Sequence, residues 1–273
     1  PTREKKRKEA TVTSVNLLGN RSRGAHYRDP EVSPEGPRET EPLSPETAAA
    51  NERLVDEWAD RLHDAPADKI MEWTHEHAPG AIAVTMSMEN TVLAELAARH
   101  LPEADLLFLD TGYHFEETLA TARAVDERYE LPLVTARPIL TRAEQDATYG
   151  PDLYRSNPTA CCLMRKVEPP ARQLSGYVGW GTGLRRADGP TRAHAPALSL
   201  DHTGRLKISP IITWTLEETQ KFIDANHLVE NPLTHQGYPS IGCATCTLPV
   251  AEGKDPRAGR WANSTKTECG LHS

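Results

Sequence analysis

Three short apolar segments that alternate with helical patterns constrain the fold of this chain more than any other feature. Residues 81–86, 105–110 and 132–138 have the length and apolar composition of buried strands. The stretches that follow the first two, 90–99 and 115–128, have helical periodicity. Strands that alternate with helices in this way are typical of a parallel sheet with helices on both faces. We therefore expect an α/β fold with a doubly wound, mostly parallel sheet.

The remaining patterns place this sheet within one domain. Helical periodicity begins at Glu46, and we predict a second helix over 67–77, a strand over 177–183 and a late helix over 216–227. The N-terminal residues combine a run of charges with repeated prolines and few large apolar side chains, a composition that favours disorder. The sequence thus predicts a disordered segment over 1–44, an α/β domain over 45–250 and a mobile C-terminal tail over 251–273.

Composition argues against two broad classes of partner. The formal net charge is −8, whereas proteins that bind nucleic acids in general carry a basic surface. No stretch approaches the roughly 18 apolar residues that cross a bilayer, and the N-terminus lacks the apolar core of a signal peptide. We expect a cytoplasmic protein with no nucleic-acid partner and no membrane partner.

Five cysteines fall into three groups with different expected chemistry. Cys161 and Cys162 are adjacent, Cys243 and Cys246 form a C-x-x-C pair, and Cys269 stands alone four residues from the end. An odd, uneven set is a poor disulfide framework, whereas thiolates are soft ligands for zinc and iron–sulfur clusters. Structural zinc sites usually pair two C-x-x-C segments, so the tandem pair favours a 4Fe-4S cluster, with zinc as the alternative. The four grouped cysteines are candidate metal ligands, and Cys269 is a candidate nucleophile.

Polar loops and cations indicate where an anionic ligand would bind. In open α/β sheets, ligands bind beyond the carboxyl ends of the strands. Thr85 and Ser87 follow the first predicted strand, where their hydroxyl groups can donate hydrogen bonds. Guanidinium and ammonium groups neutralise anionic oxygens, and this acidic chain carries such groups after the tandem cysteines at Lys166, Arg185, Arg186, Arg192, Arg257 and Arg260.

Three segments, in this order, closely resemble the assimilatory adenylyl-sulfate (APS) reductases of the APS/PAPS reductase family. They are TACCLMRKVEPP around the tandem pair, IGCATCTLP around the C-x-x-C pair, and ECGLH at the C-terminus. The resemblance runs from about Leu54 to the C-terminus and does not include the residues before it. It implies an adenine-nucleotide alpha-hydrolase-like fold and a 4Fe-4S cluster held by Cys161, Cys162, Cys243 and Cys246.

The resemblance also implies roles in catalysis and substrate binding. In that family the cysteine that matches Cys269 attacks the substrate sulfur. The substrate pocket is lined by positions that match Lys166, Arg192, Arg257, Arg260 and His272. The segment from Leu109 to Phe115 is similar to the family's L-D-T-G-Y-H-F segment, which lies against the nucleotide.

We therefore expect Leu109 and Gly183 to contact the substrate. Thr85 and Ser87 occupy the place of the family's phosphate loop, where Met88 departs from the glycine of many members. This departure weakens the case for a close backbone cradle.

The function implied is the thioredoxin-dependent reduction of adenylyl sulfate to sulfite and AMP, in assimilatory sulfate reduction and cysteine biosynthesis. Cys269 would form an enzyme S-sulfocysteine, from which thioredoxin or a similar dithiol would release sulfite. Homo-oligomerisation is compatible with this function.

Three alternatives stay open. The first is reduction of the 3'-phosphorylated substrate (PAPS), although members that prefer PAPS generally lack the four cluster cysteines. The second is a non-catalytic iron–sulfur or zinc redox sensor, which leaves the terminal ECGLH unexplained. The third is an ATP-using adenylyltransferase, whose expected S-G-G-x-D-S loop is absent from residues 85–92.

Overall fold

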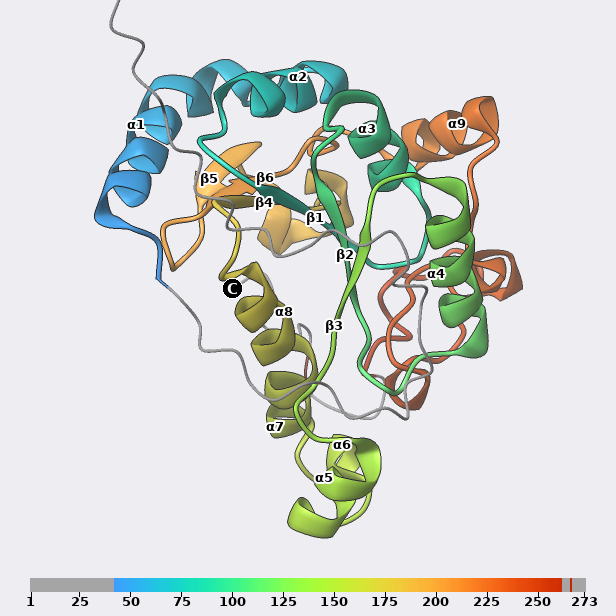
Figure 1. Cartoon of the computed structure of the whole chain (residues 1–273). Helices are drawn as coiled ribbons and strands as arrows, with labels where there is room; N and C mark the ends of the chain where they lie inside the picture. Colours follow the sequence, from blue (N-terminus) through green and yellow to red (C-terminus); the bar gives the residue numbers. More distant parts are fainter. Residues whose placement is uncertain (1–41, 262–265, 267–273) are drawn as a thin grey trace, which may run out of the picture.

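A six-stranded sheet organises residues 42–261 and 266, the part of the chain that the computed structural model describes (Figure 1). The strand order is β3-β2-β1-β4-β6-β5, and neighbours are parallel except β5, which is antiparallel to β6. This confirms the predicted mostly parallel sheet. The strands are β1 (Ile82–Met86), β2 (Asp105–Leu109), β3 (Leu133–Ala136), β4 (Gly179–Gly181), β5 (Leu198–Leu200) and β6 (Leu206–Ile208).

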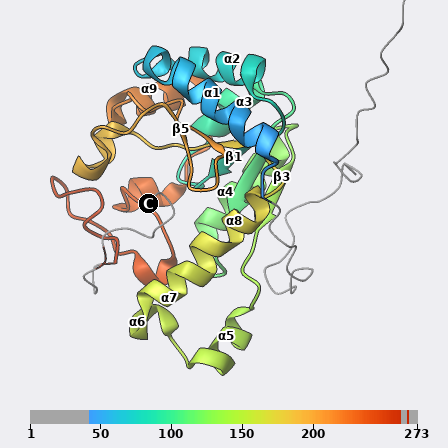
Figure 2. The ribbon, with the colours of Figure 1, turned by 90° about the vertical axis from the view of Figure 1, so that its left-hand side faces the viewer.

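Helices cover both faces of the sheet, as the doubly wound prediction requires (Figures 1 and 2). On one face, α2, α3, α4 and α9 bury apolar side chains in the main core with Val84 and Leu106. On the other, α8 packs in a smaller cluster with Ala83 and Leu107, because successive strand residues point to opposite faces. The helices are α1 (Pro45–Leu62), α2 (Ala67–His77), α3 (Val92–His100), α4 (Glu116–Arg128), α5 (Arg142–Tyr149), α6 (Leu153–Ser156), α7 (Pro158–Cys162), α8 (Glu168–Leu174) and α9 (Leu216–Asn226).

Short polar signals fix where several helices begin. Ser44 Oγ accepts a hydrogen bond from the Thr47 amide at 3.1 Å, and Pro45 occupies the first turn of α1. Both α5 and α9 begin with a capping box, in which a threonine and a glutamate three residues later accept from each other's amides. The starts of these helices are therefore determined by residues within the first turn and directly before it.

The predicted elements are present, and most of them differ from the prediction by one or two residues at an end. The predicted helix over 67–77 coincides with α2. The sequence analysis did not predict β5 and β6, each of which has only three residues. Most of the predicted disordered segment (1–41) lies outside the described residues, as do 262–265 and 267–273 of the predicted tail. In the described part, no helix has an apolar stretch long enough to cross a membrane.

A helical segment that the sequence analysis missed runs from α7 into α8 through a π-helical turn, Leu163–Val167. Pro169 and Pro170 lack the amide hydrogens that an α-helix would use. The Glu168 amide instead donates to the Leu163 carbonyl, which closes the wider turn. The chain thus stays helical directly after the tandem cysteines, and π-helical turns often occur at functional sites.

The strand order reverses between β1 and β4. The strands that follow β1 first, β2 and β3, lie on one side of it. The later strands lie on its other side, in the spatial order β4, β6, β5. The Thr85 hydroxyl donates to the Gly181 carbonyl at 2.9 Å and so ties these two strands together at their carboxyl ends. Ligands of open α/β sheets bind at such a reversal.

Candidate functional site

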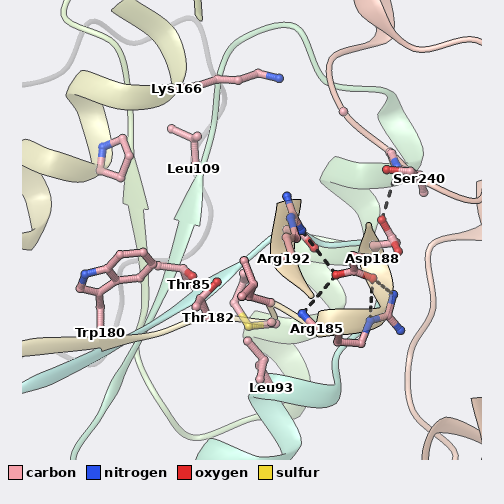
Figure 3. A pocket seen from close by; sticks show the side chains of 18 of the residues that line it. Thr85, Leu93, Leu109, Lys166, Trp180, Thr182, Arg185, Asp188, Arg192 and Ser240 are labelled. Atoms are coloured by element: carbon pink, nitrogen blue, oxygen red, sulfur yellow. Dashed lines mark hydrogen bonds and ion pairs between the residues drawn. The ribbon is translucent and has the colours of Figure 1, made fainter. Parts of the chain in front are cut away.

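A cavity of about 740 Å³ lies at this reversal, beyond the carboxyl ends of β1, β2 and β4 (Figure 3). Its walls include all the predicted substrate contacts that fall among the described residues. These are Thr85, Ser87, Leu109, Lys166, Gly183, Arg192, Arg257 and Arg260. The other two predicted residues, Cys269 and His272, lie outside the described residues. The fold therefore gathers side chains that are as far apart in sequence as Thr85 and Arg260.

The loop after β1 keeps its shape without a glycine at position 88. Met88 has a φ of 58°, in the left-handed region that favours glycine, but its side chain is fully buried in the main core. The buried Asn231 side chain donates to the Met88 carbonyl at 3.1 Å and to Thr118 Oγ1 at 3.1 Å. Burial and these hydrogen bonds offset the backbone strain, so the departure at Met88 is compatible with a well-held loop.

The loop after β2 is shaped by its own side chains. Asp110 Oδ1 accepts from the Gly112 amide at 2.9 Å, and Gly112 has a φ of 73°. His114 Nε2 lies 2.8 Å from the Leu109 carbonyl oxygen. Desolvation lowers the pKa of His114, which favours the neutral imidazole. These contacts fix the Leu109 backbone at the cavity wall.

Asp188, which sequence reasoning missed, organises two of the cations (Figure 3). Its Oδ1 lies 2.7 Å from Arg185 Nη2, and its Oδ2 lies 3.4 Å from Arg192 Nη1. Arg185 Nη1 also donates to Thr219 Oγ1 at 2.9 Å. The guanidinium groups are therefore held in place before any anion enters the cavity.

Arg260 is fixed by the segment that precedes the C-x-x-C pair. Its Nη1 donates to Ser240 Oγ at 3.0 Å and to the Ile241 carbonyl at 3.1 Å. The guanidinium carbon lies 4.8 Å from the centre of the Trp261 ring. Gly242 permits this approach, because a Cβ at that position would lie 2.7 Å from the same guanidinium carbon.

Glu89 is a second cavity residue that the sequence analysis did not identify. Its Oε2 accepts from the Ile241 amide at 3.4 Å. Desolvation raises the pKa of Glu89, while the Ile241 amide and the charges of Arg185 and Arg260 act in the opposite direction. Its position after β1 was the only signal that the sequence offered, and such a loop residue is more often an ordinary polar surface group.

The four candidate metal ligands line a smaller pocket beside the cavity, which we call the cysteine pocket. Cys161 and Cys162 end α7, and Cys243 and Cys246 bound one short 3₁₀ turn. Lys166 lines both the cavity and the cysteine pocket, and so does Cys243. The predicted substrate contacts and the predicted metal ligands therefore occupy adjoining sites.

Arg165, also missed by sequence reasoning, connects the cysteine pocket to the rest of the fold. Its side chain is buried and donates to Gln145 Oε1 at 2.6 Å and to the Thr111 carbonyl at 2.9 Å. The guanidinium carbon lies 4.9 Å from the centre of the Tyr113 ring. Arg165 thus joins the π-helical turn to α5 and to the loop after β2.

The thiols of the cysteine pocket influence one another's protonation. Burial, followed by the nearby Cys243 and Cys162 thiols, raises the pKa of Cys161 to about 12. Burial also raises the pKa of Cys162, and the charge of Lys166 opposes that rise. Thiolates that repel one another in this way would be stabilised by a bound cation. Within residues 42–261 and 266, no group of three or more His, Cys, Asp or Glu side chains is placed to hold a single metal ion.

The fold and the two adjoining sites define a class of protein. It is an α/β protein with a nucleotide-sized, cation-lined cavity at the strand-order reversal and a group of thiols beside it. Residues 81–249 match the phosphoadenosine phosphosulfate reductase domain family, and the chain belongs to this family.

Relatives within the family agree with this assignment. The chain is 48% identical over 229 residues to the adenosine 5'-phosphosulfate reductase of Mycolicibacterium smegmatis, which covers 83% of this chain and 97% of that protein. It is 47% identical over 234 residues to the adenosine 5'-phosphosulfate reductase of Streptomyces coelicolor, covering 83% and 99%. A crystal structure of the PAPS reductase of Candida auris superposes with a TM-score of 0.60 at 26% identity, covering 76% of this chain and 98% of that one.

Proposed function

We propose that the protein reduces adenosine 5'-phosphosulfate (APS) to sulfite and AMP in sulfate assimilation, with Cys269 as the nucleophile. The observation that carries this proposal is the gathering of the predicted substrate contacts around one cavity that shares Lys166 and Cys243 with the cysteine pocket. The chain is also nearly half identical to proteins named for this activity.

The cavity suits an anionic nucleotide. Its volume of about 740 Å³ lies within the range of small-molecule sites. Apolar lining from Leu109 and Trp180 can hold a base, while Lys166, Arg257 and Arg260 can neutralise phosphate and sulfate oxygens. Cations held by the fold would stabilise the charge that develops on the departing phosphate without rearranging during the reaction.

The proposed chemistry balances in two steps. In the first, the Cys269 thiolate attacks the sulfate sulfur, the bond between that sulfur and the bridging oxygen breaks, and AMP leaves with the bonding electron pair. In the second, one thiolate of an external dithiol attacks Cys269 Sγ, and sulfite leaves with the electron pair of the S–S bond. To complete this step, the second thiol of the dithiol attacks the mixed disulfide and releases the Cys269 thiol. The dithiol thereby closes to a disulfide and supplies the two electrons that convert sulfate to sulfite. We propose a protein of thioredoxin type as this dithiol.

The cysteine pocket fits the donor set of a 4Fe-4S cluster. Such a cluster takes four thiolates, and Cys161, Cys162, Cys243 and Cys246 supply four thiols from two segments that meet at one pocket. Adjacent helical residues point about 100° apart, which suits separate corners of a cubane better than one small ion. When bound, the cluster would supply a compact charged group next to Lys166. The four cysteines lie on α7 and on the 3₁₀ turn at 244–246, which meet at this pocket. A reducing cytoplasm is the compartment that we propose, because these thiols must stay reduced.

The test of this function is a single turnover without reductant. APS should release one equivalent of AMP and add about 80 Da, the mass of one SO₃ group, to the peptide that carries Cys269. Cys269→Ser should keep its iron and still bind AMP, yet form no adduct, because a hydroxyl is a much weaker nucleophile than a thiolate. An adduct on another residue, or sulfite release by the Ser variant, would overturn the role of Cys269.

A further inference from the structure

The cavity contains a carboxylate in a position where an anion-binding site would be expected to have only cations. Asp188 accepts from Arg185 Nε at 2.9 Å and from the Arg185 amide at 3.2 Å, besides its contacts with Arg185 Nη2 and Arg192. The side chains of Asp188, Arg185 and Arg192 are only 18%, 11% and 14% exposed. Both oxygens of Asp188 are thus engaged with guanidinium groups in a largely desolvated place, where charge interactions are strong.

The position of Asp188 relative to the other walls suggests which part of a nucleotide it faces. Figure 3 shows Trp180 on one side of the cavity and Asp188 on the other, with Thr85 and Thr182 between them, while Lys166 lies at a third wall. Lys166 also lines the cysteine pocket, so the reactive phosphosulfate belongs on that side. The apolar wall of Trp180 suits the base, which leaves the sugar to face Asp188.

A carboxylate and a free guanidinium group favour opposite substituents on a ribose. A carboxylate accepts hydrogen bonds from hydroxyl groups and repels phosphate, whereas an arginine binds phosphate. The same rule separates NAD sites from NADP sites in dinucleotide-binding folds. Here Asp188 already neutralises Arg185 and Arg192, and Glu89 places a second carboxyl group near Arg185.

We propose that Asp188 is a specificity-determining residue that selects a nucleotide with a free ribose 3'-hydroxyl and rejects one with a 3'-phosphate. It would do so by accepting a hydrogen bond from the sugar and by occupying the two arginines that a 3'-phosphate would need. The proposal rests on the proposed function and extends it, because it explains why this site would take APS rather than PAPS.

Binding of unreactive nucleotides tests this proposal separately from turnover. We would measure dissociation constants for AMP, adenosine 3',5'-bisphosphate and 3'-deoxy-AMP by calorimetry at one fixed salt concentration, since charge interactions depend on salt. The unaltered protein should bind AMP more tightly than either analogue. In Asp188→Asn the preference for AMP over the bisphosphate should fall by about tenfold, and the preference for AMP over 3'-deoxy-AMP should shrink.

Asp201→Asn is the matched control. Asp201 also lines the cavity, but its Oδ2 accepts from Trp180 Nε1 at 2.9 Å, so it belongs to the opposite wall. The substitution removes the same charge from the same cavity and should change the preference by less than about twofold. If the two substitutions changed this preference equally, Asp188 would act only through the negative charge that it adds to the cavity. That result would overturn the proposal.

The outcomes also distinguish a failure of the proposed function from a failure of the selectivity proposal alone. If the unaltered protein binds none of the three nucleotides, the proposed function itself fails. If it binds AMP normally and Asp188→Asn leaves both preferences unchanged, only the selectivity proposal fails. Should Asp188→Asn not fold, Asp188→Glu, which retains the charge, must still prefer AMP over the bisphosphate. The unaltered protein must also still discriminate against 3'-deoxy-AMP.

Discussion

The cavity and the cysteine pocket adjoin each other but are built in different ways. The cavity lies at the ends of β1, β2 and β4, whose backbones are hydrogen-bonded to one another across the sheet. The cysteine pocket is formed by α7, a π-helical turn and a 3₁₀ turn, each of five residues or fewer. The sheet holds the cavity in shape, whereas the pocket depends on side-chain contacts between short segments. We therefore expect the cysteine pocket to depend far more on the proposed cluster.

The largest effect should come from removing a ligand in the cysteine pocket. Cys162→Ser and Cys246→Ser should lose most of their iron and become less soluble, because metal binding is coupled to the folding of the segments it joins. Iron and acid-labile sulfide analysis, with an anaerobic absorbance spectrum, would measure this. Cys269→Ser is the control that should keep the full iron content. Full iron in either pocket variant would contradict the ligand assignment and remove the contrast between the two sites.

Lys166, which lines both sites, should show effects in both. Lys166 is nearly buried, and its ammonium lies 5.6 Å from the centre of the Trp261 ring. Lys166→Ala should lower kcat/KM for APS by about 10²-fold, because a preorganised cation next to developing charge is lost. It should also shift the visible absorbance of the iron-loaded protein, because a charge next to the thiolates has gone.

Lys207 provides the matched control for this prediction. It also lines the cavity, and its ammonium lies 5.4 Å from the centre of the Trp180 ring. Lys207→Ala should lower kcat/KM by less than about tenfold and leave the absorbance unchanged. A spectrum that responds equally to both substitutions would show that Lys166 has no particular relation to the cysteine pocket.

The same structural difference decides how much the sequence could predict. The strands around the cavity are apolar runs between helices, so β1, β2 and β3 could be located from pattern alone, and with them the loops that contain Thr85 and Leu109. The cysteine pocket could be predicted only from its cysteine motifs. Its helices were missed, because Pro169 and Pro170 normally end a helix and only the π-helical turn allows the chain to continue.

The missed side chains share one physical reason. Arg165 contacts Gln145 and Thr111, and Asp188 pairs with Arg185 and Arg192. In the sequence each is an ordinary charged residue. Their importance follows from burial and from partners that only the tertiary fold brings close, and neither quantity is encoded in local periodicity.

A smaller effect concerns the pH dependence of stability at the cavity. Desolvation raises the pKa of Glu89 above its ordinary value of 4.5, so the folded protein holds that proton more tightly than the unfolded chain does. This contribution to stability is present below the ordinary pKa and is lost as the pH rises through the raised one. Glu89→Gln removes the titration. Its melting temperature relative to the unaltered protein should therefore increase between about pH 5 and about pH 8, as measured by circular dichroism.

Glu144 provides a contrast of opposite sign on α5. Hydrogen bonds from the Thr141 amide and hydroxyl lower the pKa of this carboxyl group. Its contribution to stability is present above the ordinary pKa and is lost as the pH falls. Glu144→Gln should therefore lose relative stability as the pH rises toward the ordinary value of 4.5, and its relative stability should stay nearly constant between about pH 5 and about pH 8. If both variants show the same trend, the desolvation assigned to Glu89 is wrong.

The smallest predicted effect compares two helix caps of the same design on the two sides of the molecule. Thr141 caps α5, whose Gln145 accepts from Arg165 beside the cysteine pocket, and Thr215 caps α9, which packs on the main core. Replacing either threonine with alanine removes one capping hydrogen bond and should cost about 1 kcal/mol of stability, as measured by chemical denaturation. Only Thr141→Ala should also speed the loss of iron to a chelator, because α5 supports the cysteine pocket through Arg165. Equal rates of iron loss in the two variants would show that the cysteine pocket does not depend on α5.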